Sequence, residues 1–321
     1  MNIDIFLPNH SMGLMVDSQV FQEALSAFGC KVRIFRVPLS FYIAPYDLNL
    51  ITPGGADLVI FIEKILIHPK MLEYPRRILS LNPEWLINEE VEKIGLITEI
   101  WHKTKFSYSQ VEPKFPAIRH ALIGFTTPDP KRRVDNFNTY IHFRGKSLHR
   151  NTQRIINCWE KNNKWPPLKI QAYGDGTSIH FPHWVDWTKN ISCYFGFMET
   201  ESYLECATSG GIHLCLSETE AFGHYINESR AMGALTVVLD APPMNELVDS
   251  DSGFVIPVSH VSPCNFGVRF YASDEAIYSG LEKVIALSQG DKKELGINAR
   301  KRYEYERKIF NQQLENVCFS H

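Results

Sequence analysis

The sequence predicts an α/β protein made of two units, each built on a mainly parallel sheet. Short apolar runs, which are typical of buried strands, alternate along the chain with stretches in which apolar residues recur at helical spacing. Strands that alternate with helices in this way form parallel sheets joined by right-handed crossovers. The chain has 321 residues, of which 44% are hydrophobic, so it is long enough for two cores of ordinary domain size.

The N-terminal half contains the first alternating set. Its expected strands are the apolar runs at 3–8, 31–37, 56–63, 76–82, 95–101 and 119–125. Between the first two runs, Val16, Val20 and Ala24 recur at helical spacing, and Gly29 ends the pattern. The polar segment 126–136, TTPDPKRRVDN, contains prolines and charges and is expected to link two domains. We therefore assign residues 1–135 to an N-terminal domain.

The C-terminal half repeats the alternation. Its expected strands are 139–145, 168–174, 191–196, 211–217, 235–240 and 253–258, and its expected helices are 151–163, 199–209, 224–233 and 274–288. Residues 136–298 are assigned to a second domain on this basis. The charged tail at 299–321 is expected to be a helix that packs back toward the N-terminal domain.

The net charge and the apolar runs of the chain limit the classes of partner that the sequence predicts. The net charge is −3, which is not typical of a nucleic-acid-binding protein, so no stable nucleic-acid partner is expected. No stretch approaches the ~20 consecutive apolar residues that span a membrane. Weak peripheral contact with a membrane stays open, because the tail carries several Lys and Arg residues, although Glu304 and Glu306 interrupt them.

The cysteines and the start of the chain indicate the compartment. The seven cysteines are scattered and none forms a C-x-x-C pair, which argues against a disulfide framework and a structural zinc site. The first residues lack the basic region and the long apolar run of a signal peptide. We therefore expect a cytoplasmic protein.

The stretch SETEAFGHYINESRAMGA carries the strongest chemical signal. Glu220 follows an expected strand, and Gly223 removes the Cβ at a point where a ligand can approach the backbone. The helix that begins near His224 offers N–H groups and a positive dipole end, which suit a diphosphate. The carboxylates of Glu220 and Glu228 can each accept hydrogen bonds from a diol. The alternative is that Glu220 caps the helix and Glu228 is a surface residue.

Two other strand ends carry groups of the same kind. Lys146 and Arg150 lie in a loop before an expected helix, where two cations can hold both phosphates of a diphosphate. Met244 and Asn245 begin another expected helix, which is a second candidate cradle for a phosphate or a sugar. Carboxyl ends of parallel strands are where such sheets bind ligands, so we expect the three segments to converge.

The second half resembles the donor domain of the retaining GT-B glycosyltransferases of family 4 type, also called glycosyltransferase group 1. Residues Glu220 to Glu228 match the spacing of the E-x(7)-E motif of that family, with Ala221 in place of its first glycine. The resemblance covers residues 136–290 well and the N-terminal half loosely. It implies a GT-B fold, in which two Rossmann-like domains with mainly parallel sheets face a central cleft.

The resemblance also implies roles for individual residues. Glu220, Lys146 and Arg150 would be catalytic, with Glu220 on the hydroxyls of the donor sugar and the two cations on the leaving diphosphate. Glu228 would bind the donor ribose, and Gly13, in a loop after the first strand, would close over the donor from the other domain. The remaining donor-binding residues would be Phe222, Gly223, His224, Tyr225, Met244 and Asn245.

The implied reaction is a hexosyltransferase-like step of glycan biosynthesis. A sugar would move from a nucleotide-diphosphate sugar to the hydroxyl of a glycan or another acceptor, with retention of configuration and without a cofactor or metal. His180 and His183 lie three residues apart, but no carboxylate or cysteine is grouped with them, so a structural role is favoured over a metal site. The alternatives are a nucleotide-sugar epimerase, a non-catalytic nucleotide-sugar binding protein, and a transferase whose acceptor is modified DNA.

Overall fold

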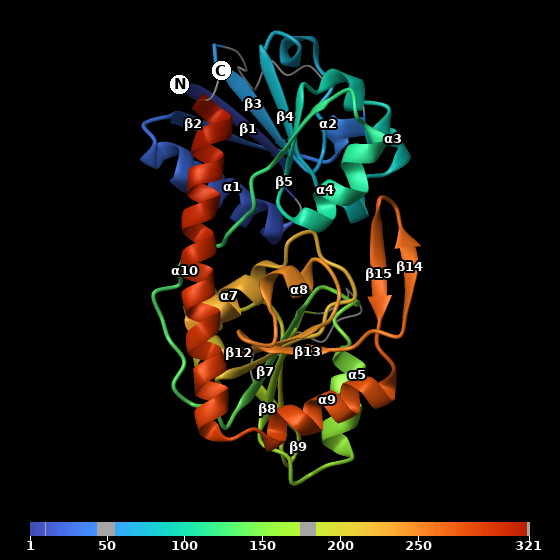
Figure 1. Ribbon diagram of the computed structural model, residues 1–321, viewed down its shortest axis with the longest axis vertical. Coiled ribbons are helices and arrows are strands. Elements are labelled where there is room, and N and C mark those ends of the chain that lie inside the picture. Colours follow the sequence, from blue (N-terminus) through green and yellow to red (C-terminus); the bar gives the residue numbers. More distant parts are fainter. Residues whose placement is uncertain (10, 44–54, 174–183, 320–321) are drawn as a thin grey trace. The chain divides into compact units, whose positions relative to one another are not determined.

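The computed structural model describes residues 1–9, 11–43, 55–173 and 184–319. The chain divides into two compact units (Figure 1). Unit 1 consists of Met1–Pro128, Pro263–Val268 and Glu306–His321, and unit 2 consists of Asp129–Ser262 and Arg269–Tyr305. Each unit is built around its own mainly parallel sheet, as the alternating pattern predicts.

The described strands of unit 1 form a six-stranded parallel sheet in the order β2-β1-β3-β4-β5-β6. The strands are β1 (Asn2–Pro8), β2 (Lys31–Val37), β3 (Leu58–Ile62), β4 (Arg76–Ser80), β5 (Glu99–His102) and β6 (Arg119–Leu122). The α-helices are α1 (Met12–Ala27), α2 (Ser40–Ile43), α3 (Asn88–Val91) and α4 (Lys105–Val111). Four 3₁₀ turns complete the described elements: η2 (Pro69–Met71), η3 (Pro83–Trp85), η4 (Ile94–Leu96) and η5 (Glu112–Lys114).

The apolar pattern accounts for most of these elements. All five residues of β3 are buried, because the crossover connections of a parallel sheet cover both of its faces. Helix α1 buries one stripe that includes Val20 and Leu25, and Gly29 follows it at a positive φ of 80°. One expected strand, 95–101, is shifted: residues Ile94–Leu96 form η4 and the strand begins only at Glu99. A continuous apolar run does not distinguish a buried turn from a strand.

The described strands of unit 2 form a seven-stranded sheet in the order β13-β12-β11-β7-β8-β10-β9, parallel except for the antiparallel edge strand β9. The strands are β7 (Tyr140–Gly145), β8 (Leu168–Ala172), β9 (Trp184–Thr188), β10 (Ile191–Phe195), β11 (Ile212–Cys215), β12 (Leu235–Leu239) and β13 (Phe254–Ile256). Strands β14 (His260–Cys264) and β15 (Gly267–Tyr271) form a two-stranded sheet of their own. The helices are α5 (Thr152–Glu160), α6 (Thr200–Thr208), α7 (His224–Met232), α8 (Met244–Leu247), α9 (Asp274–Ala286) and α10 (Gln289–Phe319).

The chain passes from unit 1 to unit 2 after Pro128, inside the segment expected to be the linker and before the expected boundary at residue 135. Two contacts within unit 2 explain the difference. The Asp129 carboxylate accepts a hydrogen bond from Arg300 at 2.7 Å, and the amide of Val134 donates to the carbonyl of Met232 at 3.1 Å. These bonds hold most of the expected linker against unit 2.

The charged tail is the end of one long helix. Helix α10 (red in Figure 1) starts at Gln289, so the expected boundary at residue 299 falls inside it, and its residues from Glu306 onward belong to unit 1. Arg76 of unit 1 donates to the carbonyls of Val317 and Cys318, which satisfies acceptors that a helix C-terminus leaves without an intrahelical partner. The helix end is thereby bonded to β4.

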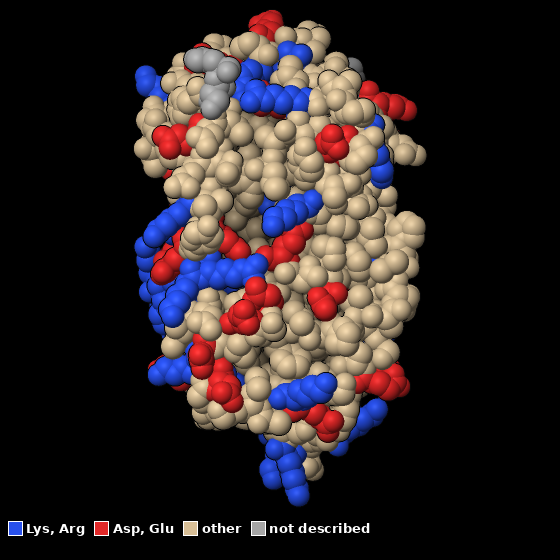
Figure 2. Space-filling view, viewed as in Figure 1, with Lys and Arg blue, Asp and Glu red and all other residues tan. Residues whose placement is uncertain are grey.

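Three further features bear on the class of protein that the sequence predicts. All seven cysteines, each of which the structure describes, are free thiols, as the spacing predicts. None of the described helices combines the length and the apolar character that crossing a membrane requires. On the face shown in Figure 2, Lys and Arg side chains are interspersed with Asp and Glu side chains and do not form one large area of a single sign.

Candidate active site

The sheet order of unit 2 brings the three expected segments to one edge. Strands β7, β11 and β12 are neighbours, and both of their pairings are parallel, so their carboxyl ends lie side by side. The segment with Lys146 and Arg150 follows β7, the segment with Glu220 follows β11, and the segment with Met244 follows β12. The edge formed by the carboxyl ends is the usual ligand edge of such a sheet.

Gly223 is required by the backbone at the start of helix α7. Its φ is 94° and its ψ is 61°, a left-handed conformation that residues with a Cβ rarely adopt. A Cβ at this position would lie 2.9 Å from Cδ1 of Ile226. Its carbonyl accepts hydrogen bonds from the amides of Ile226 and Asn227, both at 3.0 Å. The glycine therefore lets the chain turn from the Glu220 segment directly into the helix.

Arg150 is a largely buried cation, and not all of the N–H donors of its guanidinium are engaged. Its guanidinium carbon lies 3.8 Å from the centroid of the Tyr225 ring, and one terminal nitrogen donates to the carbonyl of Phe143 at 2.8 Å. The other terminal nitrogen lies 3.8 Å from Oε1 of Glu220. Its Nε is buried and has no hydrogen-bond partner among the described residues. A planar group held in this way can receive an anion on its remaining donors.

Glu220 is held in the same cluster by Ser217. The Ser217 hydroxyl donates to Oε1 of Glu220 at 2.6 Å and also shares a 2.6 Å hydrogen bond with the hydroxyl of Tyr225. The side chains of Glu220 and Arg150 are each 19% exposed, so part of each is accessible from solvent. Ser217, Glu220, Tyr225 and Arg150 are called the arginine cluster below.

Glu228 lies on α7 and is bonded to helix α6. The hydroxyl of Tyr203 donates to Oε2 of Glu228 at 2.5 Å. Burial raises the pKa of the Glu228 carboxyl, whereas the hydrogen bond from Tyr203 and the charges of His224 and Arg150 act in the opposite direction. Glu228 is therefore a half-buried acceptor at the same edge of the sheet, fixed by one named donor.

Lys146 is placed differently from Arg150. Its side chain is exposed, and its ammonium lies 4.7 Å from the centroid of the Tyr173 ring. The structure therefore brings Arg150 together with Glu220 but leaves Lys146 against an aromatic face. A lysine on a flexible stem can leave such a contact, which contributes about 0.5–1 kcal/mol at exposed sites.

The third expected segment, which contains Met244 and Asn245, offers fewer groups to a ligand than the sequence indicates. Met244 is fully buried, and helix α8, which it begins, has one turn. The amide of Asn245 donates to the carbonyl of Ala241 at 3.0 Å, and the side-chain amide donates to Asp240 at 3.1 Å. Asn245 is thus bonded within its own turn, so its amide is already engaged.

The motif residues between the two glutamates have mixed exposure. Phe222 and Tyr225 are buried, and the Phe222 ring lies 5.4 Å from the ring of the half-buried His224. The backbone of His224 and Tyr225 forms the start of helix α7, directly after Gly223. His180 and His183 lie outside the described residues.

Gly13 lies in the first turn of helix α1 of unit 1, and this corrects the expectation of a glycine in a loop. The apolar pattern of the helix extends further toward the N-terminus than residue 16, because Leu14 is buried. The helix therefore begins at Met12, directly after Ser11 as its N-cap, and includes Gly13.

Hairpin strand β15 contributes residues that the sequence did not single out. The terminal nitrogen of Arg269 lies 3.3 Å from Nε2 of His149, and Nδ1 of His149 lies 3.7 Å from a carboxylate oxygen of Glu218. The amide of Phe270 donates to the carbonyl of Glu218 at 2.7 Å. These contacts fasten the hairpin to the loops after β7 and β11. No local spacing predicts them, because β15 is remote from both loops in the sequence.

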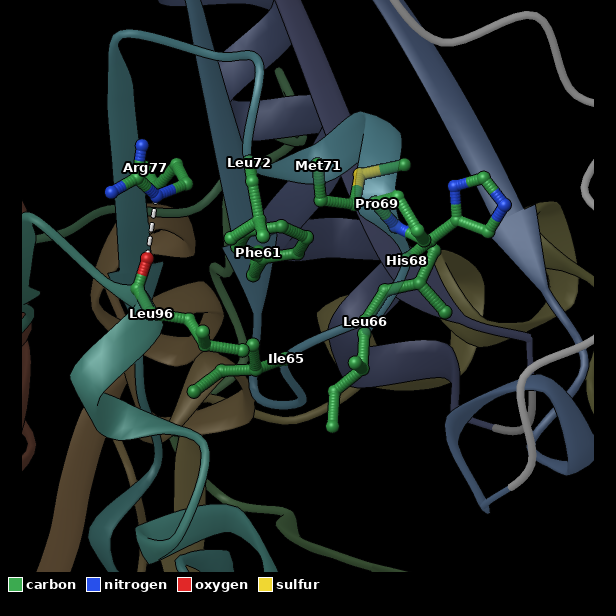
Figure 3. Close-up of a pocket in the computed structure, with 10 residues that line it drawn as sticks. Phe61, Ile65, Leu66, His68, Pro69, Met71, Leu72, Arg77 and Leu96 are labelled. Atoms are coloured by element: carbon green, nitrogen blue, oxygen red, sulfur yellow. Dashed lines mark hydrogen bonds between the residues drawn. The ribbon is translucent and has the colours of Figure 1, made fainter.

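A cavity of about 180 Å³ lies in unit 1, away from the predicted residues. Its lining is mostly apolar and comes from the segment after β3 together with η4 (Figure 3). Arg77 is the charged member of its lining, and its Nε donates to the carbonyl of Leu96 at 2.5 Å. An apolar lining with its one cation engaged by the backbone does not suit a diphosphate, so we place the site elsewhere.

A second cavity of about 370 Å³ lies in unit 2 between α6 and strands β8 and β10. Tyr194 and Met198 are part of its lining. Neither Glu220 nor Arg150 lines either of these cavities. The site is therefore defined by the contacts of the arginine cluster and not by a closed cavity.

No protein-family model matches the chain. No curated protein sequence matches it either.

Solved structures match along the whole chain. A sucrose-phosphate synthase from Thermosynechococcus elongatus is 10% identical, with 99% of this chain and 98% of that chain covered, at a TM-score of 0.71. HepE of Anabaena in complex with UDP is 13% identical, with both chains covered completely, at a TM-score of 0.68. An α-glucosyltransferase in complex with UDP and a 13-mer DNA containing an HMU base is 13% identical, with 99% of both chains covered, at a TM-score of 0.64.

Similarity at this level of identity shows the fold alone. The expectation of an α/β protein with mainly parallel sheets is confirmed. The chain has the GT-B fold of these glycosyltransferases, in which two Rossmann-like units each carry a parallel sheet.

Proposed function

We propose that this protein is a metal-independent glycosyltransferase of the retaining family 4 type. It moves a hexose from a nucleotide-diphosphate sugar to an acceptor hydroxyl with retention of configuration. The observation that carries the proposal is the arginine cluster, in which a largely buried guanidinium and a held carboxylate meet at the carboxyl ends of β7 and β11. A GT-B fold without this cluster would leave the function open, because fold alone does not determine function.

The arginine cluster suits the diphosphate of the donor. Negative charge grows on the diphosphate as it leaves, and a transition state of that kind is stabilised by donors already in place. The buried Nε of Arg150, which has no hydrogen-bond partner among the described residues, is such a donor. The N-terminus of α7, a helix of nine residues, adds its positive dipole end, and Lys146 adds an exposed ammonium.

The two glutamates suit the hydroxyls on either side of that diphosphate. Glu220 approaches Arg150 and is oriented by Ser217, so its carboxylate can accept from a sugar hydroxyl next to the reacting carbon. Glu228, which lies farther along α7 and is held by Tyr203, can accept from the ribose hydroxyls. In this arrangement one carboxylate binds each sugar of the donor.

The proposed step is front-side displacement. Glycosyl transfer passes through an oxocarbenium-like state. The acceptor oxygen attacks on the face from which the phosphate departs, the bond from the anomeric carbon to the phosphate oxygen breaks, and that phosphate oxygen takes the acceptor proton. No divalent ion is required if Arg150, Lys146 and the helix end stabilise the leaving group.

The structural neighbours support UDP-sugars as the first donors to test. HepE was solved with UDP and glucose, and a trehalose-6-phosphate protein from E. coli was solved with UDP-2-fluoro glucose. A glycan or another neutral hydroxyl compound is the favoured acceptor, because the chain has a net charge of −3 and interspersed surface charges on the face of Figure 2. The DNA complex of the α-glucosyltransferase keeps modified DNA as the alternative acceptor.

Four measurements test the function. A thermal-shift panel of nucleoside diphosphates and nucleotide sugars identifies the donor, because a bound ligand raises the melting temperature by mass action. NMR of the donor with protein alone then detects an epimerase, which changes the sugar without an acceptor. Binding without release of the nucleotide, even with a panel of glycan and DNA acceptors present, indicates a binding protein and contradicts the proposal. Acceptor affinity that falls steeply with salt favours DNA.

A further inference from the structure

Glu228 is bonded to a residue that comes from a different helix. The Tyr203 hydroxyl on α6 donates to Oε2 of the Glu228 carboxylate on α7 at 2.5 Å. Burial and the nearby charge of Glu228 raise the pKa of Tyr203 well above its usual value. The phenol therefore keeps its proton and acts as a hydrogen-bond donor to the carboxylate at all ordinary pH values.

Tyr203 is itself held by the sheet. Its ring lies 4.6 Å from the ring of Phe143 on β7, and it packs against the apolar cluster around Phe143, Cys206 and Met232. The carbonyl of Phe143 accepts the hydrogen bond from Arg150. One strand residue thus supports both the guanidinium and, through Tyr203, the carboxylate.

Four groups from different elements face the Glu228 carboxylate. Tyr203 reaches it from α6, and His224 lies one turn earlier on α7. Arg150 acts on it from the loop after β7, and the thiol of Cys215 lies near it at the end of β11. Tyr203 makes a direct side-chain hydrogen bond to this carboxylate, at Oε2.

We propose that Tyr203 is a positioning residue for donor binding, because it anchors Oε2 of Glu228 and leaves Oε1 to accept hydrogen bonds from the ribose diol of the donor nucleotide. The proposal rests on the proposed function in one respect, that Glu228 binds the ribose. It adds a residue outside the E-x(7)-E motif. It also assigns each carboxylate oxygen a separate partner.

The expected effect of Tyr203→Phe follows from the loss of this donor. The carboxylate would stay in a buried position with its orientation no longer fixed, and the hydrogen bond that opposes its protonation would be gone. The pKa of Glu228 would then rise further. Nucleotide affinity in the variant would therefore fall as the pH is lowered, whereas the wild-type carboxylate stays ionised over more of the same range. His224 and Arg150 are present in both proteins, so the comparison isolates the loss of the Tyr203 hydroxyl.

The test uses the full chain and the tightest binder among UDP, GDP and ADP, measured by calorimetry between pH 5.5 and 8.5. Tyr203→Phe is expected to bind about tenfold more weakly, in the range for a hydrogen bond to a charged group, and to weaken further toward low pH. Glu228→Gln is expected to bind weakly at every pH. Tyr278→Phe, which removes a phenol bonded to Asn162 elsewhere in unit 2, is the matched control and is expected to bind like the wild type.

Two further measurements separate positioning from a loss of folding. The ratio of the affinities for the nucleotide and its 2′,3′-dideoxy analogue does not depend on the folded fraction, and it is expected to drop toward one in Tyr203→Phe. The double variant Tyr203→Phe with Glu228→Gln is expected to be no weaker than Glu228→Gln alone. Normal affinity of Tyr203→Phe at all pH values, with weak binding by Glu228→Gln, would overturn this inference and leave the proposed function intact. Normal affinity of Glu228→Gln, or a wild type that binds none of the three nucleotides, would overturn both.

Discussion

Acid is expected to loosen the part of unit 2 that carries the candidate site, and His142 is the group that makes this testable. His142 lies on β7 and is fully buried. Its Nδ1 donates to the carbonyl of Leu214 on β11, and its Nε2 accepts from the hydroxyl of Thr152 on α5, both at 2.8 Å. The histidine therefore ties together the strands whose ends bear Arg150 and Glu220.

The magnitude follows from the pKa of His142. Burial lowers this pKa to about 4, and the charges of Arg150 and Arg144 act in the same direction. The unfolded chain has the ordinary value of about 6.5 and so binds more protons between those two values. The contribution of neutral His142 to stability is therefore complete above about pH 6.5 and is lost as the pH falls toward 4. Between pH 7 and pH 5 the loss amounts to about 2 kcal/mol.

The assay is urea unfolding of the full chain at pH 7 and at pH 5, followed by circular dichroism. His142→Gln keeps one amide donor and one amide acceptor but does not titrate, so it should lose about 2 kcal/mol less than the wild type between the two pH values. His260→Gln removes an exposed histidine and serves as the control, which should follow the wild type. Equal losses in the wild type and in His142→Gln would refute the reasoning.

Four further outcomes are expected. Arg150→Ala should lower the transfer rate roughly 100-fold or more while the protein stays folded, because in the proposed mechanism it removes a donor to the leaving diphosphate. Arg119→Ala, which removes an exposed arginine, is the control, and an active Arg150→Ala excludes Arg150 from the site. Glu220→Gln should lose most transfer activity with little change in melting temperature, and a fully active variant would contradict its assignment. Gly223→Ala should destabilise unit 2 by about 1 kcal/mol or more, as seen in urea unfolding, because the left-handed turn and the contact with Ile226 disfavour a Cβ; unchanged stability would refute this. Transfer from an α-linked donor should give an α-linked product by NMR, and a β product would contradict retention. Transfer should also persist in EDTA, and loss of activity in EDTA would contradict metal independence.

The local sequence pattern was sufficient to predict most of the helices and strands. Strand 31–37 was expected at the positions where β2 is found, and the expected helix at 224–233 differs from α7 by one residue. Apolar periodicity and the turn chemistry of glycine are properties of neighbouring residues, so they can be recognised without the rest of the molecule. The same holds for Glu220, Gly223 and Glu228, whose spacing lies within a single turn and helix.

The sequence by itself determined the α/β alternation and the two-unit organisation, and it supplied the residue pattern on which the proposed nucleotide-sugar site rests. The tertiary structure alone decided which side chains share that site. It paired Tyr203 with Glu228 and Arg269 with His149, stacked Arg150 on Tyr225, and left Lys146 beside Tyr173. It also placed Gly13 inside a helix. The physical reason is that strand order and the packing of helices on a sheet join residues far apart in the chain, and no local periodicity carries that information.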